Sequence, residues 1–166
     1  MFKTDSFNKK IIRKKFNFLR KKIYLKNAII SSVVPKTFHQ IKKIFFELYK
    51  VNCIELKKLN LSRLINIKVN KKEVGSDRLA NAISVLSKKK NFIVVDFGTA
   101  TTFDVIKKNN YLGGVIAPGV ALSLDNLIKK ASLIPNIELH KSKSIIGKNT
   151  KQAVLSGFFW GYNGLI

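Results

Sequence analysis

Short β-branched segments alternate along the chain with segments whose apolar residues recur at helical spacing, and this alternation constrains the fold most. Segments typical of strands occupy residues 28–35, 53–56, 63–70, 91–97, 101–108, 111–118 and 135–140. Segments with helical spacing occupy residues 1–27, 38–49, 75–89, 120–132 and 149–166. Because strands that alternate with helices form a sheet covered by those helices, the order predicts an α/β fold.

Two of these segments allow more detailed expectations. Residues 28–35, AIISSVVP, are apolar around two serines, which predicts a strand that is buried on both faces and ended by Pro35. The helix predicted over residues 75–89 has Ser76 as its N-cap. The two residues that follow Ser76 therefore fall in the first turn of that helix.

The composition is that of a folded protein. Hydrophobic residues make up 46% and charged residues 25%, and 166 residues allow one domain or parts of two. The formal net charge of +23 has two interpretations. A basic face would bind nucleic acid, whereas lysines in nearly every polar gap, beside abundant Asn, Ile and Phe, are typical of AT-rich codon usage. The scattered lysines favour the second interpretation, so nucleic-acid binding is not expected.

Neither cysteine nor histidine chemistry is indicated. Cys53 is the only cysteine, which excludes an internal disulfide and a cysteine zinc site. His39 and His140 each lie among lysines and apolar residues, and we expect them at the surface or as hydrogen-bonded core residues. No apolar run reaches transmembrane length and no signal peptide is evident, so we expect no membrane association and a cytoplasmic protein.

The segment VVDFGTATTFDVI combines a carboxylate with a glycine and several hydroxyls. Asp96 ends a predicted buried strand, Gly98 permits close approach of backbone N–H groups, and Thr99, Thr101 and Thr102 place hydroxyls in one turn. Such a turn can bind phosphate oxygens through its amides and hydroxyls while Asp96 holds a cation. A β-hairpin with threonines favoured by strand propensity explains the same residues, and the motif alone does not decide.

The tetrapeptide GSDR is the second candidate. Asp77 in the first turn of a helix is kept ionised by the helix dipole and can accept a proton from an alcohol. Arg78 offers a fork of donors to a carbonyl or carboxylate. A plain capped helix with an aspartate in its first turn explains these four residues equally well when they are taken alone.

Taken together, the motifs resemble one family. SSVVP, GSDRLANA, VVDFGTATTFDVI, YLGGVIAPG and IGKNTKQAVLSG occur in the order and approximate spacing of type III pantothenate kinases, members of the actin-like ATPase and sugar-kinase superfamily. The resemblance implies ATP-dependent phosphorylation of pantothenate, the first step of coenzyme A biosynthesis. It also implies an α/β, ribonuclease H-like fold of two lobes, here incomplete, with residues 1–90 in the first lobe and 91–166 in the second.

The resemblance also implies roles for individual residues. Asp77 is similar to the general base, Asp96 to the ligand of a monovalent cation (potassium or ammonium), and Thr99 to an ATP contact. The residues that would hold pantothenate together with Asp77 are Gly75, Ser76, Arg78 and Thr150. Thr150 would act across the interface of a homodimer. Magnesium would accompany ATP, although the sequence shows no dedicated cage for it.

The chain departs from the family pattern in three places. The family opens with a D-x-G-N-T phosphate loop and continues past GLI to a TGG segment, and neither is found here. Lys68 and Lys71 replace the tyrosine and the proline that precede GSDR in the family, while Asn70 is retained. We therefore expect a chain truncated at both ends, with little kinase activity alone, because an ATP site between two lobes would lack half of its donors.

Two other functions remain as alternatives. Members of this family were also described as accessory factors for transcription, and a charge of +23 would suit a non-catalytic regulator. Retention of Asp77, Asp96 and Thr99 argues against that alternative, since a regulator needs none of them. A fragment that only dimerises, or pairs with a missing piece, would explain the apolar terminal segment that ends at Ile166.

Overall fold

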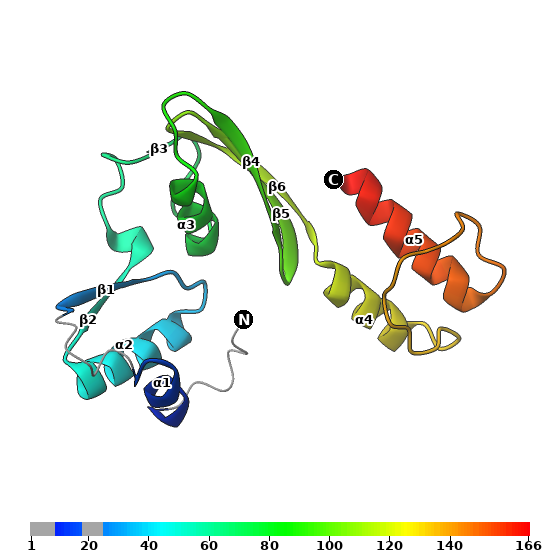
Figure 1. Ribbon diagram of the computed structural model, residues 1–166, viewed down its shortest axis with the longest axis horizontal. Helices are drawn as coiled ribbons and strands as arrows, with labels where there is room; N and C mark the ends of the chain where they lie inside the picture. The colour runs from blue at the N-terminus through cyan, green and yellow to red at the C-terminus, as the bar shows by residue number, and fades with distance from the viewer. Residues whose placement is uncertain (1–8, 18–24) are drawn as a thin grey trace. The chain divides into compact units, whose positions relative to one another are not determined.

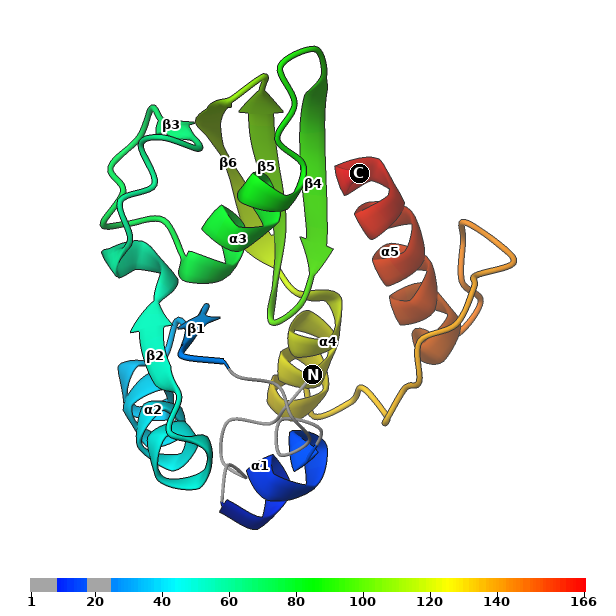
Figure 2. The same ribbon diagram turned by 60° about the vertical axis from the view of Figure 1, so that its left-hand side comes forward.

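The computed structural model describes residues 9–17 and 25–166, which fold into two compact units (Figures 1 and 2). The first unit comprises the described residues up to Phe92 together with Asp104–Gly113. The second unit comprises Ile93–Phe103 and Gly114–Ile166. Each unit is described by itself below.

The first unit begins with helices packed beside a small parallel sheet. Its elements are α1 (Lys9–Lys15), β1 (Asn27–Ile30), α2 (Pro35–Tyr49) and β2 (Asn52–Glu55). β1 and β2 pair in parallel from Asn27↔Asn52 to Ile30↔Glu55. The buried side chains that hold these elements together are Ile12, Ile44, Phe45, Val51 and Cys53. The helix expected over residues 1–27 is described only as α1, and Leu19 lies outside the described residues.

The prediction that residues 28–35 form a strand buried on both faces is wrong. β1 ends at Ile30, and its residues alternate between exposed and half-buried. The side chains of Ile29 and Val33 are each 62% exposed. The reason is that β1 has β2 as its only partner strand in the described chain. Apolar residues in such a strand do not imply that both of its faces are buried. Pro35 begins α2, a position where its missing N–H costs nothing.

Lysine side chains connect the loops that lead to α3 (Ser76–Ser84). Lys57, in a 3₁₀ turn at Leu56–Lys58, donates to the carbonyl oxygen of Lys72 at 2.8 Å. Lys71 donates to the carbonyl oxygen of Leu59 at 3.1 Å. Lys71 therefore connects this loop to the backbone at Leu59 through its ammonium group.

Helix α3 is shorter than the sequence predicts. It ends at Ser84 instead of continuing to residue 89. The Ser87 hydroxyl accepts hydrogen bonds from the backbone N–H groups of Lys89 and Lys90. A serine that bonds to backbone groups two and three residues ahead favours a turn over a helix, which explains the early end.

A four-stranded sheet has the order β3-β6-β5-β4. Its strands are β3 (Asn66–Ile67), β4 (Asn91–Phe97), β5 (Ala100–Lys107) and β6 (Asn110–Pro118). The three long strands confirm the predictions for these segments, and the short β3 pairs in parallel with β6. The expected burial of β4 is wrong: Ile93 is 67% exposed and Phe97 is 59% exposed. The reason is that β4 lies at the edge of the sheet that the described residues form.

Two helices follow the sheet in the second unit. They are α4 (Val120–Lys130) and α5 (Thr150–Leu165). Asn149 caps α5 by accepting from the backbone N–H of Gln152 at 2.9 Å. The strand expected at residues 135–140 is absent, and this described segment joins neither sheet. None of the helices within residues 9–17 and 25–166 combines the length and apolar character that a membrane crossing requires.

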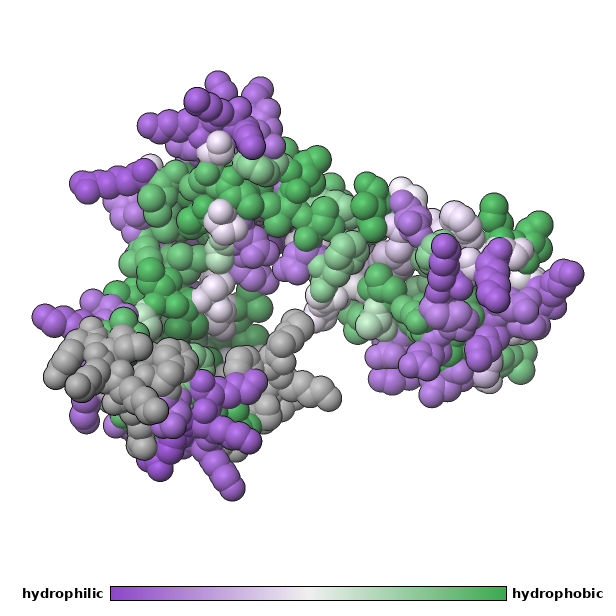
Figure 3. Space-filling view, in the orientation of Figure 1, coloured by the Kyte–Doolittle hydropathy of each residue, from purple (hydrophilic) through white to green (hydrophobic). Residues whose placement is uncertain are grey.

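The hydrophilic residues do not gather into one stripe on the face seen in Figure 3. Hydrophilic side chains, coloured purple, lie at several separate places on this face and on both units. The lysines and arginines, 32 in all, are likewise distributed along the sequence of both units.

Candidate active site

The first turn of α3 carries the GSDR residues. Gly75 is the N-cap, in an extended conformation, and Ser76 is the first helical residue, so the prediction that Ser76 caps the helix is wrong. The Ser76 side chain is buried, and its hydroxyl has no hydrogen-bond partner within the described residues. A Cβ atom at Gly75 would overlap Oδ1 of Asp77. Glycine therefore leaves room for the aspartate to fold back over the start of the helix.

Asp77 is exposed, and its carboxylate is fixed at one oxygen. The backbone N–H of Arg78 donates to Oδ1 of Asp77 at 2.8 Å. An exposed carboxylate that is held by a backbone amide is well placed to accept a proton from a bound alcohol.

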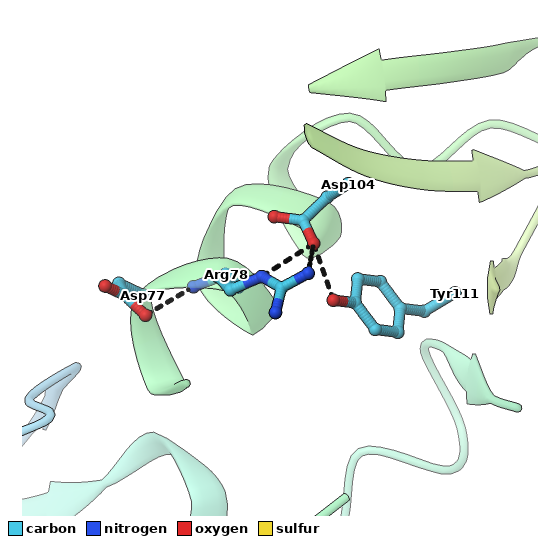
Figure 4. Close-up of polar contacts among 4 residues, drawn as sticks. All are labelled: Asp77, Arg78, Asp104 and Tyr111. Carbon is cyan, nitrogen blue, oxygen red and sulfur yellow. Dashed lines mark hydrogen bonds and ion pairs between the residues drawn. The ribbon is translucent and has the colours of Figure 1, made fainter. Parts of the chain in front are cut away.

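Arg78 makes its side-chain contacts with a buried aspartate that the sequence analysis did not single out. Nε of Arg78 donates to Oδ1 of Asp104 at 2.9 Å, and Nη2 lies 2.6 Å from the same oxygen (Figure 4). The hydroxyl of Tyr111 also donates to this oxygen, at 2.6 Å. Asp104 and Tyr111 are both 0% exposed. The sequence feature that could have identified Asp104 is its position as an acidic residue inside the apolar strand segment FDVI.

The cluster changes the proton affinity of two of its members. Burial, followed by the hydrogen bond to Asp104, raises the pKa of the Tyr111 hydroxyl. For Arg78, burial alone would lower the pKa, but the hydrogen bond and the attraction to Asp104 raise it. Arg78 therefore stays charged, and Tyr111 stays protonated as a donor.

Replacing Tyr111 by phenylalanine is expected to reduce the loss of stability at alkaline pH. The pKa of Tyr111 is raised on folding, so above about pH 10 the unfolded chain releases this proton first. The wild type should then lose about 1.4 kcal/mol of unfolding free energy per pH unit from this group, and Tyr111→Phe should not. Urea unfolding of both proteins on either side of pH 10 measures the difference, and a difference independent of pH would contradict the prediction.

A pocket of about 280 Å³ lies beside the start of α3, within the first unit. Gly75 and Ser76 line it together with Ser32 from the loop after β1. Side chains of both signs, among them Lys57 and Glu73, complete the wall. Two of the predicted substrate-binding residues therefore contribute to a pocket of a size suited to a small polar ligand.

The turn between β4 and β5 carries the second group of predicted site residues. Asp96, near the end of β4, and Thr99, in the turn, are both exposed. Only Thr99 of the three threonines lies in the turn, because Thr101 and Thr102 belong to β5. Both of those are buried, and their hydroxyls have no partner within the described residues. The expected concentration of three hydroxyls in one turn is therefore wrong.

Gly119 holds this turn against the start of α4. Its backbone N–H donates to the carbonyl oxygen of Thr99 at 3.0 Å. A Cβ atom at this position would overlap the backbone carbonyl groups of Gly98 and Thr99. The turn and the helix can approach this closely only because residue 119 has no side chain.

Replacing Gly119 by alanine is expected to displace the 98–99 turn and to lower the free energy of unfolding by about 1–3 kcal/mol, as overpacking does elsewhere. The backbone of Gly119 has a negative φ, so the cost is steric and not conformational. Gly157→Ala on α5 is the matched control, because an added Cβ there meets nothing within 4 Å. Thermal or urea unfolding measures both variants, and equal stability of Gly119→Ala and wild type would refute the close contact.

The predicted site residues fall into two groups. Gly75, Ser76, Asp77 and Arg78 lie together in the first unit, whereas Asp96 and Thr99 lie in the second. Thr150 is the exposed first residue of α5, also in the second unit.

Metal ligands are sparse in the part of the chain that the structure describes. No three His, Cys, Asp or Glu side chains there gather into a metal-binding group. Magnesium in nucleotide sites is typically bound through phosphates and one or two carboxylates, so the absence of a cage among these residues is compatible with it. The exposed carboxylate of Asp96 is a hard oxygen ligand of the type that such cations prefer.

Comparison with known proteins decides the family. A family model described as type III pantothenate kinase matches residues 3–166. The chain belongs to the type III pantothenate kinase family. Two curated members named type III pantothenate kinase are similar to it. The protein of Pelagibacter ubique is 62% identical over 142 residues, and that of Citrifermentans bemidjiense is 42% identical over 144. Each match covers 86% of this chain and 57% of the relative.

A solved structure supports the mixed α/β fold of this type III pantothenate kinase family member. A Campylobacter jejuni protein described as a conserved putative Baf family transcriptional activator aligns with a TM-score of 0.58 and 22% identity. The alignment covers 91% of this chain and 66% of the other. At this identity the likeness shows a shared fold only.

Proposed function

We propose that the chain forms the substrate-binding and base-bearing part of an ATP-dependent pantothenate kinase. The observation that carries the proposal is the exposed carboxylate of Asp77, held at the first turn of α3 next to a pocket lined by Gly75 and Ser76. Membership of the type III pantothenate kinase family supplies the substrate and the reaction.

In the proposed reaction the primary hydroxyl of pantothenate attacks the γ-phosphorus of ATP. Asp77 accepts the hydroxyl proton as the new oxygen–phosphorus bond forms, the bond to the bridging β–γ oxygen breaks, and ADP leaves. Phosphoryl transfer depends mainly on positioning and on charge neutralisation, so the base has a modest task. Pantothenate is held by Gly75, Ser76 and Arg78, with Thr150 as a further contact across a homodimer interface.

ATP is proposed to contact the turn that contains Thr99. Asp96 would hold a monovalent cation, potassium or ammonium, and magnesium would accompany the nucleotide. When bound, these cations neutralise charge on the phosphates. Thr99 is exposed, and its carbonyl oxygen accepts a hydrogen bond from the backbone N–H of Gly119, which ties the turn to the start of α4.

The architecture that we propose is the ribonuclease H-like fold of two lobes. Residues 1–90 would belong to the first lobe and residues 91–166 to the second. A cytoplasmic homodimer is the proposed assembly. The structural similarity to the Campylobacter jejuni protein supports the fold but bears on neither the assembly nor the compartment.

A domain replacement tests the proposed function. The matching 142 residues of the Pelagibacter ubique relative would be replaced by the corresponding residues of this chain. Phosphoryl transfer to pantothenate is then measured with ATP, Mg²⁺ and K⁺ for the chimera, for the relative and for this chain. We expect the chimera to be active. An active relative beside an inactive, folded chimera would overturn the proposal, and salt-sensitive DNA binding without an effect of ATP would favour the regulator.

A further inference from the structure

The side chains of Asp104 and Tyr111 hold Arg78 from the sheet side of α3. Asp104 lies on β5 and Tyr111 on β6, and the guanidinium group of Arg78 and the hydroxyl group of Tyr111 both donate to Oδ1 of Asp104 (Figure 4). Three donors, which are Nε and Nη2 of Arg78 and the hydroxyl of Tyr111, lie between 2.6 and 2.9 Å from that oxygen. The guanidinium group is therefore fixed both in position and in rotation.

Burial of the ion pair between Arg78 and Asp104 costs desolvation free energy. The side chain of Arg78 is 13% exposed and that of Asp104 is 0% exposed. A buried ion pair contributes little net stability, because desolvation offsets the attraction between the charges. Moreover, Oδ2 of Asp104 is buried without a partner among the described residues. Apolar side chains of similar size would make the same contact at lower cost.

The fixed arginine connects the buried cluster to the exposed end of α3. Its backbone N–H holds Oδ1 of Asp77, while its side chain reaches in the opposite direction to Asp104 (Figure 4). The contacts of the guanidinium group with Asp104 use Nε and Nη2. Nε and Nη2 form one edge of the guanidinium group, and this edge is used for positioning, whereas Nη1 lies outside it.

We propose that Asp104, assisted by Tyr111, is a positioning residue that orients Arg78 to bind the carboxylate of the acid substrate. The inference rests on the proposed function, because pantothenate supplies that carboxylate. Asp104 and Tyr111 touch neither the substrate nor the reacting atoms and act only through Arg78. A guanidinium group that is already oriented binds a carboxylate without first losing side-chain entropy.

The test compares two ligands that differ at the carboxylate. Pantothenate and pantothenol, in which a hydroxymethyl group replaces the carboxylate, are titrated by calorimetry into the wild-type chain and into Asp104→Asn. We expect the substitution to raise the dissociation constant of pantothenate about tenfold, the usual effect of losing a hydrogen bond to a charged group. Binding of pantothenol should change less than about threefold. Tyr111→Phe should also raise the dissociation constant of pantothenate, by a smaller factor.

The controls separate positioning from general damage. Asp125→Asn makes the same chemical change at an exposed position on α4 and should leave both dissociation constants unchanged. Equal losses for the acid and the alcohol in Asp104→Asn would overturn the inference, because they indicate a structural role alone. If Asp104→Asn does not fold, the same comparison is made with Tyr111→Phe: the change in the dissociation constant of pantothenate is compared with that of pantothenol. A wild-type chain that binds neither ligand would overturn the proposed function itself, whereas wild-type affinity in Asp104→Asn would overturn only the positioning.

Discussion

Replacing Asp77 by asparagine is expected to lower the kcat of pantothenate phosphorylation about 10²-fold to 10⁴-fold. Asparagine cannot accept the proton of the substrate hydroxyl. Its side-chain oxygen can still accept the bond from the backbone N–H of Arg78, so the start of α3 should be preserved. Because Asp77 is exposed, no buried contact is lost and the free energy of unfolding should change by less than about 0.5 kcal/mol.

The measurement uses the active chimera, with turnover and urea unfolding determined in parallel. Asp125→Asn is again the matched control and should retain activity. A normal rate in the Asp77→Asn chimera would remove Asp77 as the base. A large loss of stability would instead indicate that the carboxylate is a structural cap.

Of the single substitutions considered, replacing Arg78 by methionine is expected to lower the free energy of unfolding most. The substitution removes the cation from Asp104 and leaves a carboxylate that is 0% exposed with Tyr111 as its remaining donor. Breaking one side of a buried ion pair costs about 3–5 kcal/mol, because the other charge is left uncompensated. Total stabilities of domains are about 5–15 kcal/mol, so this single change should lower the urea midpoint strongly.

A multiple substitution identifies the cause of that loss. Combining Arg78→Met with Asp104→Leu and Tyr111→Phe removes every polar member of the cluster at once. Stability should then recover to within about 1–2 kcal/mol of the wild type, since no buried polar atom of the cluster is left unpaired. Failure to recover would show that packing around Arg78, and not the buried charge, determines the cost.

The order of elements followed from the sequence because local signals agreed with one another. The segments at residues 91–97, 101–108 and 111–118 are separated by short turn sequences, one with glycine and one with two asparagines, and the structure confirms all three as strands. The helices α2, α4 and α5 were expected from apolar spacing and begin at Pro35, Val120 and Thr150. Patterns within one element are sufficient for predictions of this kind.

Burial could not be predicted in the same way. β1 and β4 have the apolar runs of buried strands, yet Ile29 and Ile93 are more than 60% exposed. Which strand lies at the edge, and which face is covered, depends on neighbours far away in sequence. Asp104 and Tyr111 were missed for the same reason: only pairing of β5 with β6 beneath α3 brings them to Arg78.

The exposed edge strand has a consequence for the behaviour of the protein in solution. Within the described residues β4 pairs with β5 alone, and it carries the exposed apolar side chains of Ile93 and Phe97, so it can act as a template for pairing with another chain. A net charge of +23 opposes such encounters by mutual repulsion. Salt shortens the range of that repulsion to about 10 Å at 0.1 M. Colloidal stability should therefore fall as ionic strength rises, the reverse of ordinary salting-in.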